Sequence, residues 1–111
     1  MEKAFRNWRE GAIHLNFPNG NQISTTWAAI GSYSDNHDLQ TDYSKPRVGD
    51  RIDPVVESNT VEVMITCGEK LQKRLEKKFN DGYAQPLGYL TMEDWLYVVD
   101  KVSKEKTLSN K

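Results

Sequence analysis

The fold is decided by residues 12–27, AIHLNFPNGNQISTTW. Apolar and polar side chains alternate on both sides of the central PNG, a pattern typical of two β-strands that each bury one face. A two-residue loop at the Asn-Gly pair would pair Leu15 with Ser24 and place the two apolar sets on opposite faces. A three-residue loop over residues 18–20 pairs Leu15 with Ile23, so that both sets share one face. We therefore predict a β-hairpin with a three-residue turn.

Two further patterns follow towards the C-terminus. Residues 61–67 alternate apolar and polar side chains, which predicts a strand with one buried face. Residues 69–79 carry Leu, Leu and Phe at every fourth position, which predicts a short amphipathic helix. The Asn-Asp-Gly sequence over residues 80–82 is a helix stop signal. A second helix is expected after Thr91, an N-cap residue that is followed three positions later by Asp94.

This order of elements predicts an α+β fold. We expect a small antiparallel sheet with an N-terminal β-hairpin and two C-terminal helices packed on one face. The chain of 111 residues has the common size of one domain. We predict a single α+β domain over residues 1–103 and a frayed tail over residues 104–111.

Composition limits the classes of partner and compartment. The chain has 15 Lys and Arg residues against 16 Asp and Glu residues, a formal net charge of −1. A generic DNA-binding protein has an excess of basic residues, and a DNA mimic has a large acidic excess, so neither class is expected. Cys67 is the only cysteine, which excludes an intramolecular disulfide and fits a reducing, cytoplasmic setting. No apolar run approaches the length that spans a bilayer, and we expect no membrane association.

The common catalytic motifs are not found in this sequence. The sequence contains no Walker loop, no His-Glu-x-x-His and no Gly-x-Ser-x-Gly. His37 lies between Asp35 and Asp38, which suits a general base or metal ligand, but a polar turn is the commoner structure for such a segment. Cys67 precedes a helix, where a thiol can be activated, although free cysteines usually serve as small hydrophobic residues. We expect no enzyme, no metal site and no cofactor.

The first predicted helix is strongly basic. A solvated helix face explains this charge most simply, and a limited anion-binding site is the alternative. The basic residues of this helix are Lys70, Lys73, Arg74, Lys77 and Lys78.

The region over residues 28–59 is the best candidate for ligand binding. It lacks a periodic pattern and is rich in small and polar residues, which indicates short strands combined with a functional loop. Aromatic rings there can stack on a base, hydroxyl and amide groups can form hydrogen bonds, and arginines can hold phosphate. The alternative is that these side chains only hold the loop together. The predicted ligand-binding residues are Trp27, Ser32, Tyr33, Ser34, Asn36, His37, Arg47 and Arg51.

Four short motifs follow one another along the chain: FPNGNQIS at 17–24, GSYSDN at 31–36, VEV at 61–63 and GYLTMED at 88–94. In this order they resemble small accessory proteins encoded by tailed phages and prophages. Two parts of the chain depart from what is expected of such proteins: the segment over residues 40–59 and the basic helix. The resemblance implies a role in countering host defence.

The strand-rich first part and the two terminal helices are similar to the Thoeris anti-defence sponges, which form oligomers and sequester cyclic nucleotide signals without cleaving them. This resemblance implies a non-catalytic homo-oligomer in the host cytoplasm that binds a small nucleotide-like ligand. The alternative is a protein-protein inhibitor of a host defence effector, of the anti-CRISPR or anti-restriction type, that uses the hairpin or the basic helix. A small enzyme that depends on His37 is the third possibility.

Overall fold

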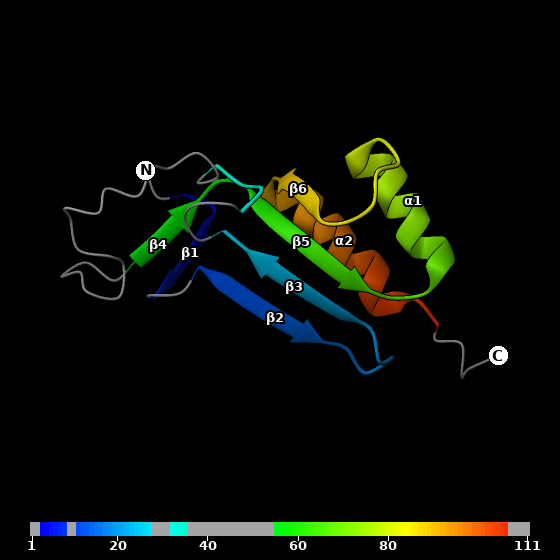
Figure 1. The fold of residues 1–111 in the computed structure, drawn as a ribbon. Helices are drawn as coiled ribbons and strands as arrows, with labels where there is room; N and C mark the ends of the chain where they lie inside the picture. Colours follow the sequence, from blue (N-terminus) through cyan, green and yellow to red (C-terminus); the bar gives the residue numbers. More distant parts are fainter. Residues whose placement is uncertain (1–2, 9–10, 28–31, 36–54, 107–111) are drawn as a thin grey trace.

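The chain has an α+β fold, as predicted (Figure 1). The computed structural model describes residues 3–8, 11–27, 32–35 and 55–106. These residues form two antiparallel sheets, of two and four strands, and two helices. Within the described residues, no helix has the length and apolar character needed to cross a membrane. In chain order the elements are β1 (Phe5–Trp8), β2 (Ala12–Asn16), β3 (Gln22–Thr26), β4 (Val55–Ser58), β5 (Val61–Thr66), α1 (Glu69–Asn80), β6 (Leu87–Leu90) and α2 (Met92–Lys104).

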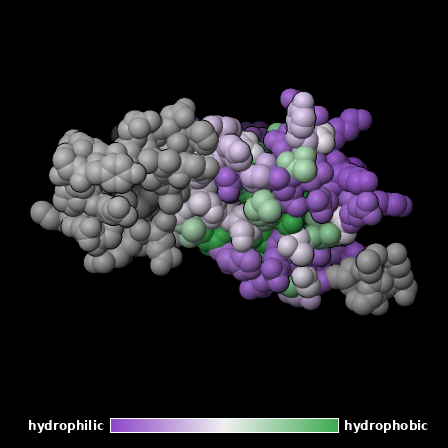
Figure 2. All heavy atoms as spheres, in the orientation of Figure 1, coloured by the Kyte–Doolittle hydropathy of each residue, from purple (hydrophilic) through white to green (hydrophobic). Residues whose placement is uncertain are grey.

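The larger sheet has the strand order β2-β3-β5-β6, and both helices pack on the same face of it (Figure 1). The core lies between the sheet and the helices, where Ile23 and Val63 share one buried cluster with Leu75 and Val98. The opposite face is open, and Met64 on it is 46% exposed. In the orientation of Figure 1, hydrophilic residues predominate on the visible surface at the α1 end of the molecule (Figure 2). The two helices are not consecutive, because β6, which sequence periodicity did not predict, separates them.

The hairpin has the predicted register. Leu15 pairs with Ile23, and the turn is closed by a bond from the Gly20 N–H to the Phe17 carbonyl at 2.9 Å. Gly20 has φ +90°, a conformation that glycine adopts without a steric penalty. Ile23 is fully buried, whereas Ile13 on the edge strand β2 is 41% exposed. The helices therefore cover β3 more completely than β2.

Both predicted helix signals are confirmed. Thr91 and Asp94 form a reciprocal capping box at the start of α2, with both bonds at 3.2 Å. α1 ends at Asn80, its C-cap Asp81 is left-handed with φ 52°, and the Gly82 N–H donates to the Glu76 carbonyl at 3.0 Å. Local side-chain chemistry therefore sets these two boundaries, because each cap satisfies backbone groups that the helix leaves unpaired.

The hairpin turn is tied to the C-terminal end of α2. The Nδ2 of Asn19 donates to the carbonyls of Val102, Ser103 and Glu105 at 3.0, 3.1 and 2.6 Å. The Glu105 carboxylate in turn accepts the N–H of Gly68 at 2.8 Å. The first two residues of the predicted tail are therefore held in place. Lys104 belongs to α2, and Glu105 accepts hydrogen bonds through both its backbone carbonyl and its side chain. Residues 107–111 lie outside the described residues.

The small sheet pairs β1 with β4 and lies beside the larger one (Figure 1). Phe5 of β1 is buried, and its ring lies 5.6 Å from the Trp27 ring and 5.8 Å from the Trp95 ring, measured between centroids. The Trp95 indole N–H donates to Thr25 Oγ1 at 2.8 Å. These aromatic contacts join the small sheet to the core, since pairs of this geometry add to the energy of burial.

Candidate functional site

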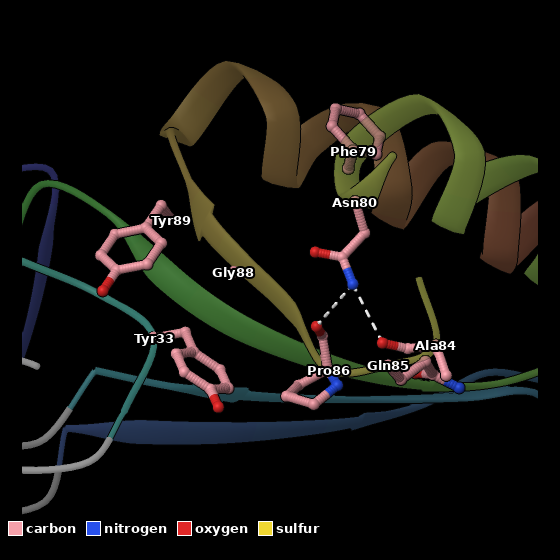
Figure 3. A pocket seen from close by; sticks show the side chains of 8 residues that line it. All are labelled: Tyr33, Phe79, Asn80, Ala84, Gln85, Pro86, Gly88 and Tyr89. Atoms are coloured by element: carbon pink, nitrogen blue, oxygen red, sulfur yellow. Dashed lines mark hydrogen bonds between the residues drawn. The ribbon is translucent and has the colours of Figure 1, made fainter. Parts of the chain in front are cut away.

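A cleft of about 450 Å³ lies where the end of α1 and the start of β6 meet the segment around Tyr33. Its lining includes the rings of Tyr33, Phe79 and Tyr89 and the amides of Asn80 and Gln85 (Figure 3). These residues come from segments that are distant in sequence. The combination of aromatic rings with a few polar groups is typical of small-molecule sites.

Tyr33 and Tyr89 stand side by side at the cleft. Their ring centroids are 6.4 Å apart and the planes are inclined by 47°. The Tyr89 N–H donates to the Tyr33 carbonyl at 2.7 Å, and the Tyr33 N–H donates to Glu62 Oε1 at 3.1 Å. Tyr33 is 42% exposed and Tyr89 50% exposed. Backbone hydrogen bonds, rather than burial of the rings, therefore position this pair.

A bulge in β6 orients Tyr89. Val61 pairs with Leu90 and Val63 pairs with Leu87, so Gly88 and Tyr89 together lie opposite a single residue of β5. Tyr89 has φ +57°, which costs a non-glycine residue about 1 kcal/mol or more. Bulges redirect side chains and often accompany functional sites. The strained backbone at Tyr89 thus turns its ring towards Tyr33 instead of following the regular alternation of the strand.

Asn80 presents a fixed hydrogen-bond acceptor. Its Nδ2 donates to the carbonyls of Tyr83, Ala84 and Pro86 at 3.1, 2.9 and 3.2 Å. Only the NH₂ group can donate to three carbonyls, so the amide orientation is determined by its partners. Its Oδ1 points away from these carbonyls (Figure 3), and no residue in the described parts of the chain donates to it. This oxygen is therefore available to accept a hydrogen bond from a ligand.

The floor of the cleft is held by a second amide, that of Gln85. Its side chain bonds the Ile65 backbone in both directions, accepting from the N–H and donating to the carbonyl at 3.0 Å. The Gln85 N–H donates to Glu76 Oε2 at 3.2 Å, and the same oxygen accepts from Gln72 Nε2 at 3.1 Å. The segment between α1 and β6 is consequently held by hydrogen bonds to both β5 and α1. A cleft built on such supports keeps its shape before a ligand arrives.

The predicted ligand-binding residues are divided by the structure. Tyr33 lines the cleft. Trp27 is only 3% exposed and packs on Phe5 in the core, so its ring is not presented to a ligand. Ser32 and Ser34 are buried and their hydroxyls bond each other at 2.8 Å. The remaining four, Asn36, His37, Arg47 and Arg51, lie outside the described residues.

Most residues of the cleft were not predicted from the sequence. Phe79 was predicted only as part of the apolar stripe of the first helix, and neither Asn80 nor Tyr89 was recognised as a ligand-binding residue. The Gly-Tyr pair at residues 88–89 is the only local signal, because a glycine inside a strand often marks a bulge or a close backbone approach. That signal depends on recognising β6, whose four residues LGYL are too few to show a period.

Cys67 and the described acidic residues are weaker candidates for a reactive or metal-binding site than the cleft is for a ligand site. Burial raises the pKa of the Cys67 thiol to about 11, and the charges of Glu105 and Glu76 act in the same direction. The thiol is therefore neutral at physiological pH despite its position before α1. Within the described residues, no three His, Cys, Asp or Glu side chains cluster as metal ligands would.

Comparison with known proteins gives no matching family model, no similar curated protein and no similar solved structure.

Proposed function

We propose that this protein is a non-catalytic binding protein that captures a small nucleotide-like ligand in the cleft beside Tyr33 and Tyr89. The observation that carries the proposal is the fixed Asn80 Oδ1 acceptor beside a pair of exposed rings. A nucleobase has a flat face that stacks on aromatic rings and N–H groups that donate from its edge. The cleft offers partners for both.

The volume of the cleft and the expected interaction energies support a small ligand. Small-molecule sites commonly measure roughly 300–1,000 Å³, and the cleft of about 450 Å³ lies within that range. Stacking of one base on an aromatic side chain contributes about 1–3 kcal/mol. One hydrogen bond to a preoriented acceptor adds about 1 kcal/mol. A phosphate contact would then be needed for tight binding.

The chemistry of the lining supports binding without turnover. Tyrosine, phenylalanine, asparagine and glutamine side chains recognise a ligand but do not exchange protons readily at neutral pH. The carboxylate nearest the floor, Glu76, is 7% exposed and is bonded by Gln72 and Gln85. The biological role that we propose is sequestration of the ligand by an oligomeric phage protein in the host cytoplasm, which follows from the resemblance of the sequence motifs.

The alternative function is inhibition of a host defence protein by direct contact. One observation favours it: β2 forms the edge of the larger sheet, and its residues AIHLN include no charge and no proline. Charged residues and prolines are the usual features that keep an edge strand from pairing with another strand. Ile13 on this strand is an exposed apolar side chain.

Thermal-shift and calorimetric titration with nucleosides, nucleotides and cyclic nucleotides tests the proposal. A ligand at 100 times its Kd stabilises the protein by about 2.7 kcal/mol. We expect binding by the wild type, at least tenfold weaker binding by Tyr33→Ala and Tyr89→Ala, and unchanged binding by the control Tyr83→Ala. Tyr83 is a suitable control because it is 74% exposed and does not line the cleft.

Three outcomes would contradict the proposal. They are silence across the whole ligand panel, equal losses in all three tyrosine variants, or recovery of a chemically altered ligand by mass spectrometry. Co-purification of a host protein that depends on Ile13 but not on Tyr33 would favour the alternative instead.

A further inference from the structure

A second concave site lies between α1 and α2. It is a groove of about 190 Å³ whose floor is formed by Leu71 and Leu75. Three basic side chains and one aromatic ring surround this floor: Arg74, Lys78, Lys101 and Tyr97. The basic groups come from both helices. No acidic residue of the described chain lines the groove.

Two ammonium groups meet at one ring. The Nζ of Lys78 lies 4.9 Å from the centroid of the Tyr97 ring, and the Nζ of Lys101 lies 5.4 Å from it. Each contact is favourable, at about 0.5–1 kcal/mol for an exposed cation–π pair. The two positive charges repel each other, however, and Arg74 adds a third to the same groove. An anion bound in this groove would offset the repulsion.

Two carboxylates on the same helices are paired with other lysines. Glu69 bonds Lys73 at 3.1 Å, and Asp100 bonds Lys104. The hydrogen bond from Lys104 is the main reason that the pKa of Asp100 is lowered, with a smaller contribution from the charge of Lys101. Within the described residues, no ion pair involves the three basic side chains of the groove. The available acids therefore leave the groove positively charged.

We propose that this groove binds a phosphate group of a small phosphorylated molecule. A guanidinium can hold two phosphate oxygens at once, while lysine ammonium groups act as mobile point charges. The apolar floor excludes water from one side and so strengthens the attraction. A groove of about 190 Å³ accommodates one such group. A nucleic acid backbone would need an extended basic surface, whereas the whole chain has a net charge of −1.

The groove and the cleft are neighbours. Phe79 lines the cleft, and its ring makes an edge contact with the Tyr97 ring of the groove at 5.8 Å between centroids. The phosphate site stands without the cleft. Its assignment to the same ligand, a phosphorylated nucleotide, rests on the proposed function.

Calorimetric titration of the full chain with inorganic pyrophosphate tests the groove directly. We expect binding by the wild type and a loss of about tenfold or more in Lys78→Gln and Lys101→Gln, because each substitution removes one charge-assisted contact. Lys77→Gln is the matched control: it removes the same charge from the next residue of α1, but Lys77 does not line the groove. We expect its affinity to stay within about twofold of the wild type, as for a surface charge.

Absence of pyrophosphate binding, or equal losses in the Lys77 and Lys78 variants, would overturn the proposal. Because the two tested lysines lie on different helices, poor folding of one variant leaves the other to decide. Adenosine and adenosine monophosphate then separate the two sites. Binding of both with equal affinity would overturn the assignment of the groove and the cleft to one ligand, whereas pyrophosphate binding without adenosine binding would support the groove and count against the cleft.

Discussion

The backbone of Gly88 lies directly against the side chain of Tyr33, so that a Cβ atom at Gly88 would stand 2.8 Å from the Cβ of Tyr33. The Tyr89 N–H reaches the Tyr33 carbonyl at 2.7 Å beside this contact. Only glycine permits such an approach without displacement of one of the two segments. This contact brings the segment over residues 32–35 onto β6 and so forms one wall of the cleft.

Gly88→Ala is therefore expected to move Tyr33 and to destabilise the fold by about 1–3 kcal/mol, the usual cost of overpacking. Gly82→Ala is the comparison. That glycine has φ +86° and no neighbour within 4 Å, so its substitution strains the backbone without touching Tyr33. Denaturant unfolding and NMR amide shifts measure both effects. Unchanged Tyr33 and Glu62 amide shifts in Gly88→Ala would show that the close approach is not required.

Asn80 should tolerate alanine better than aspartate. Asn80→Ala removes the donor to three carbonyls and is expected to cost about 1–3 kcal/mol. Asn80→Asp has nearly the same shape as the wild type, but it places a carboxylate against those carbonyls and should cost more at neutral pH. The difference in unfolding free energy between the aspartate and alanine variants should become smaller in acid, because a protonated carboxyl can donate one hydrogen bond. Equal unfolding free energies of the aspartate variant and the wild type would contradict the assigned amide orientation.

Asn19 should contribute more to stability than its place in a surface turn suggests. Its Nδ2 bonds three carbonyls at the end of α2, and only one of them, that of Val102, also accepts from Asn21 Nδ2 within the described residues. Asn19→Ala is expected to lower the unfolding free energy by about 1–3 kcal/mol. Asn16→Ala is the control, since Asn16 is exposed and its side chain bonds only His14 among the described residues. Similar urea unfolding midpoints for the two variants would contradict this expectation.

Cys67 should react slowly in the folded protein. Its pKa is raised from 9.0 to about 11, so at about pH 8 the folded state carries roughly 100-fold less thiolate than an unfolded chain. Alkylation by iodoacetamide with and without denaturant measures this difference. Similar rates in both conditions would contradict the raised pKa.

The same shift predicts the direction of a pH effect on stability. Between pH 9.0 and about 11 the unfolded chain loses the thiol proton while the folded protein keeps it. Stability conferred by the neutral thiol is therefore complete below pH 9.0 and is lost as the pH rises. Cys67→Ala should lose less stability across this interval than the wild type.

Local patterns predicted the elements that local chemistry determines. The three-residue turn sets the pairing of Leu15 with Ile23, because any other register would turn one apolar set away from the core. The capping box of Thr91 and Asp94 marks the start of α2, because both partners lie within one helical turn. The short strands β1 and β6 were missed, since four residues in each are too few to establish a period.

The candidate site was predicted only at Tyr33, and Trp27 shows why. An aromatic residue at a strand end looks the same in sequence whether it faces a ligand or the core. Trp27 faces the core because it packs against Phe5, which belongs to a strand that the sequence pattern did not reveal. The basic character of α1 was evident from the sequence. Lys101 and the Tyr97 ring, which complete the groove, belong to α2.

By itself, the amino-acid sequence determined the α+β class, the hairpin register and the helix ends, because these depend on residues a few positions apart. Only the tertiary structure decided which rings are exposed, where Asn80 directs its acceptor oxygen and which lysines share one groove. The physical reason is that Tyr33 and Tyr89 are brought together beside Asn80 by a long-range backbone hydrogen bond and a strand bulge, and neither produces a periodic pattern in the sequence.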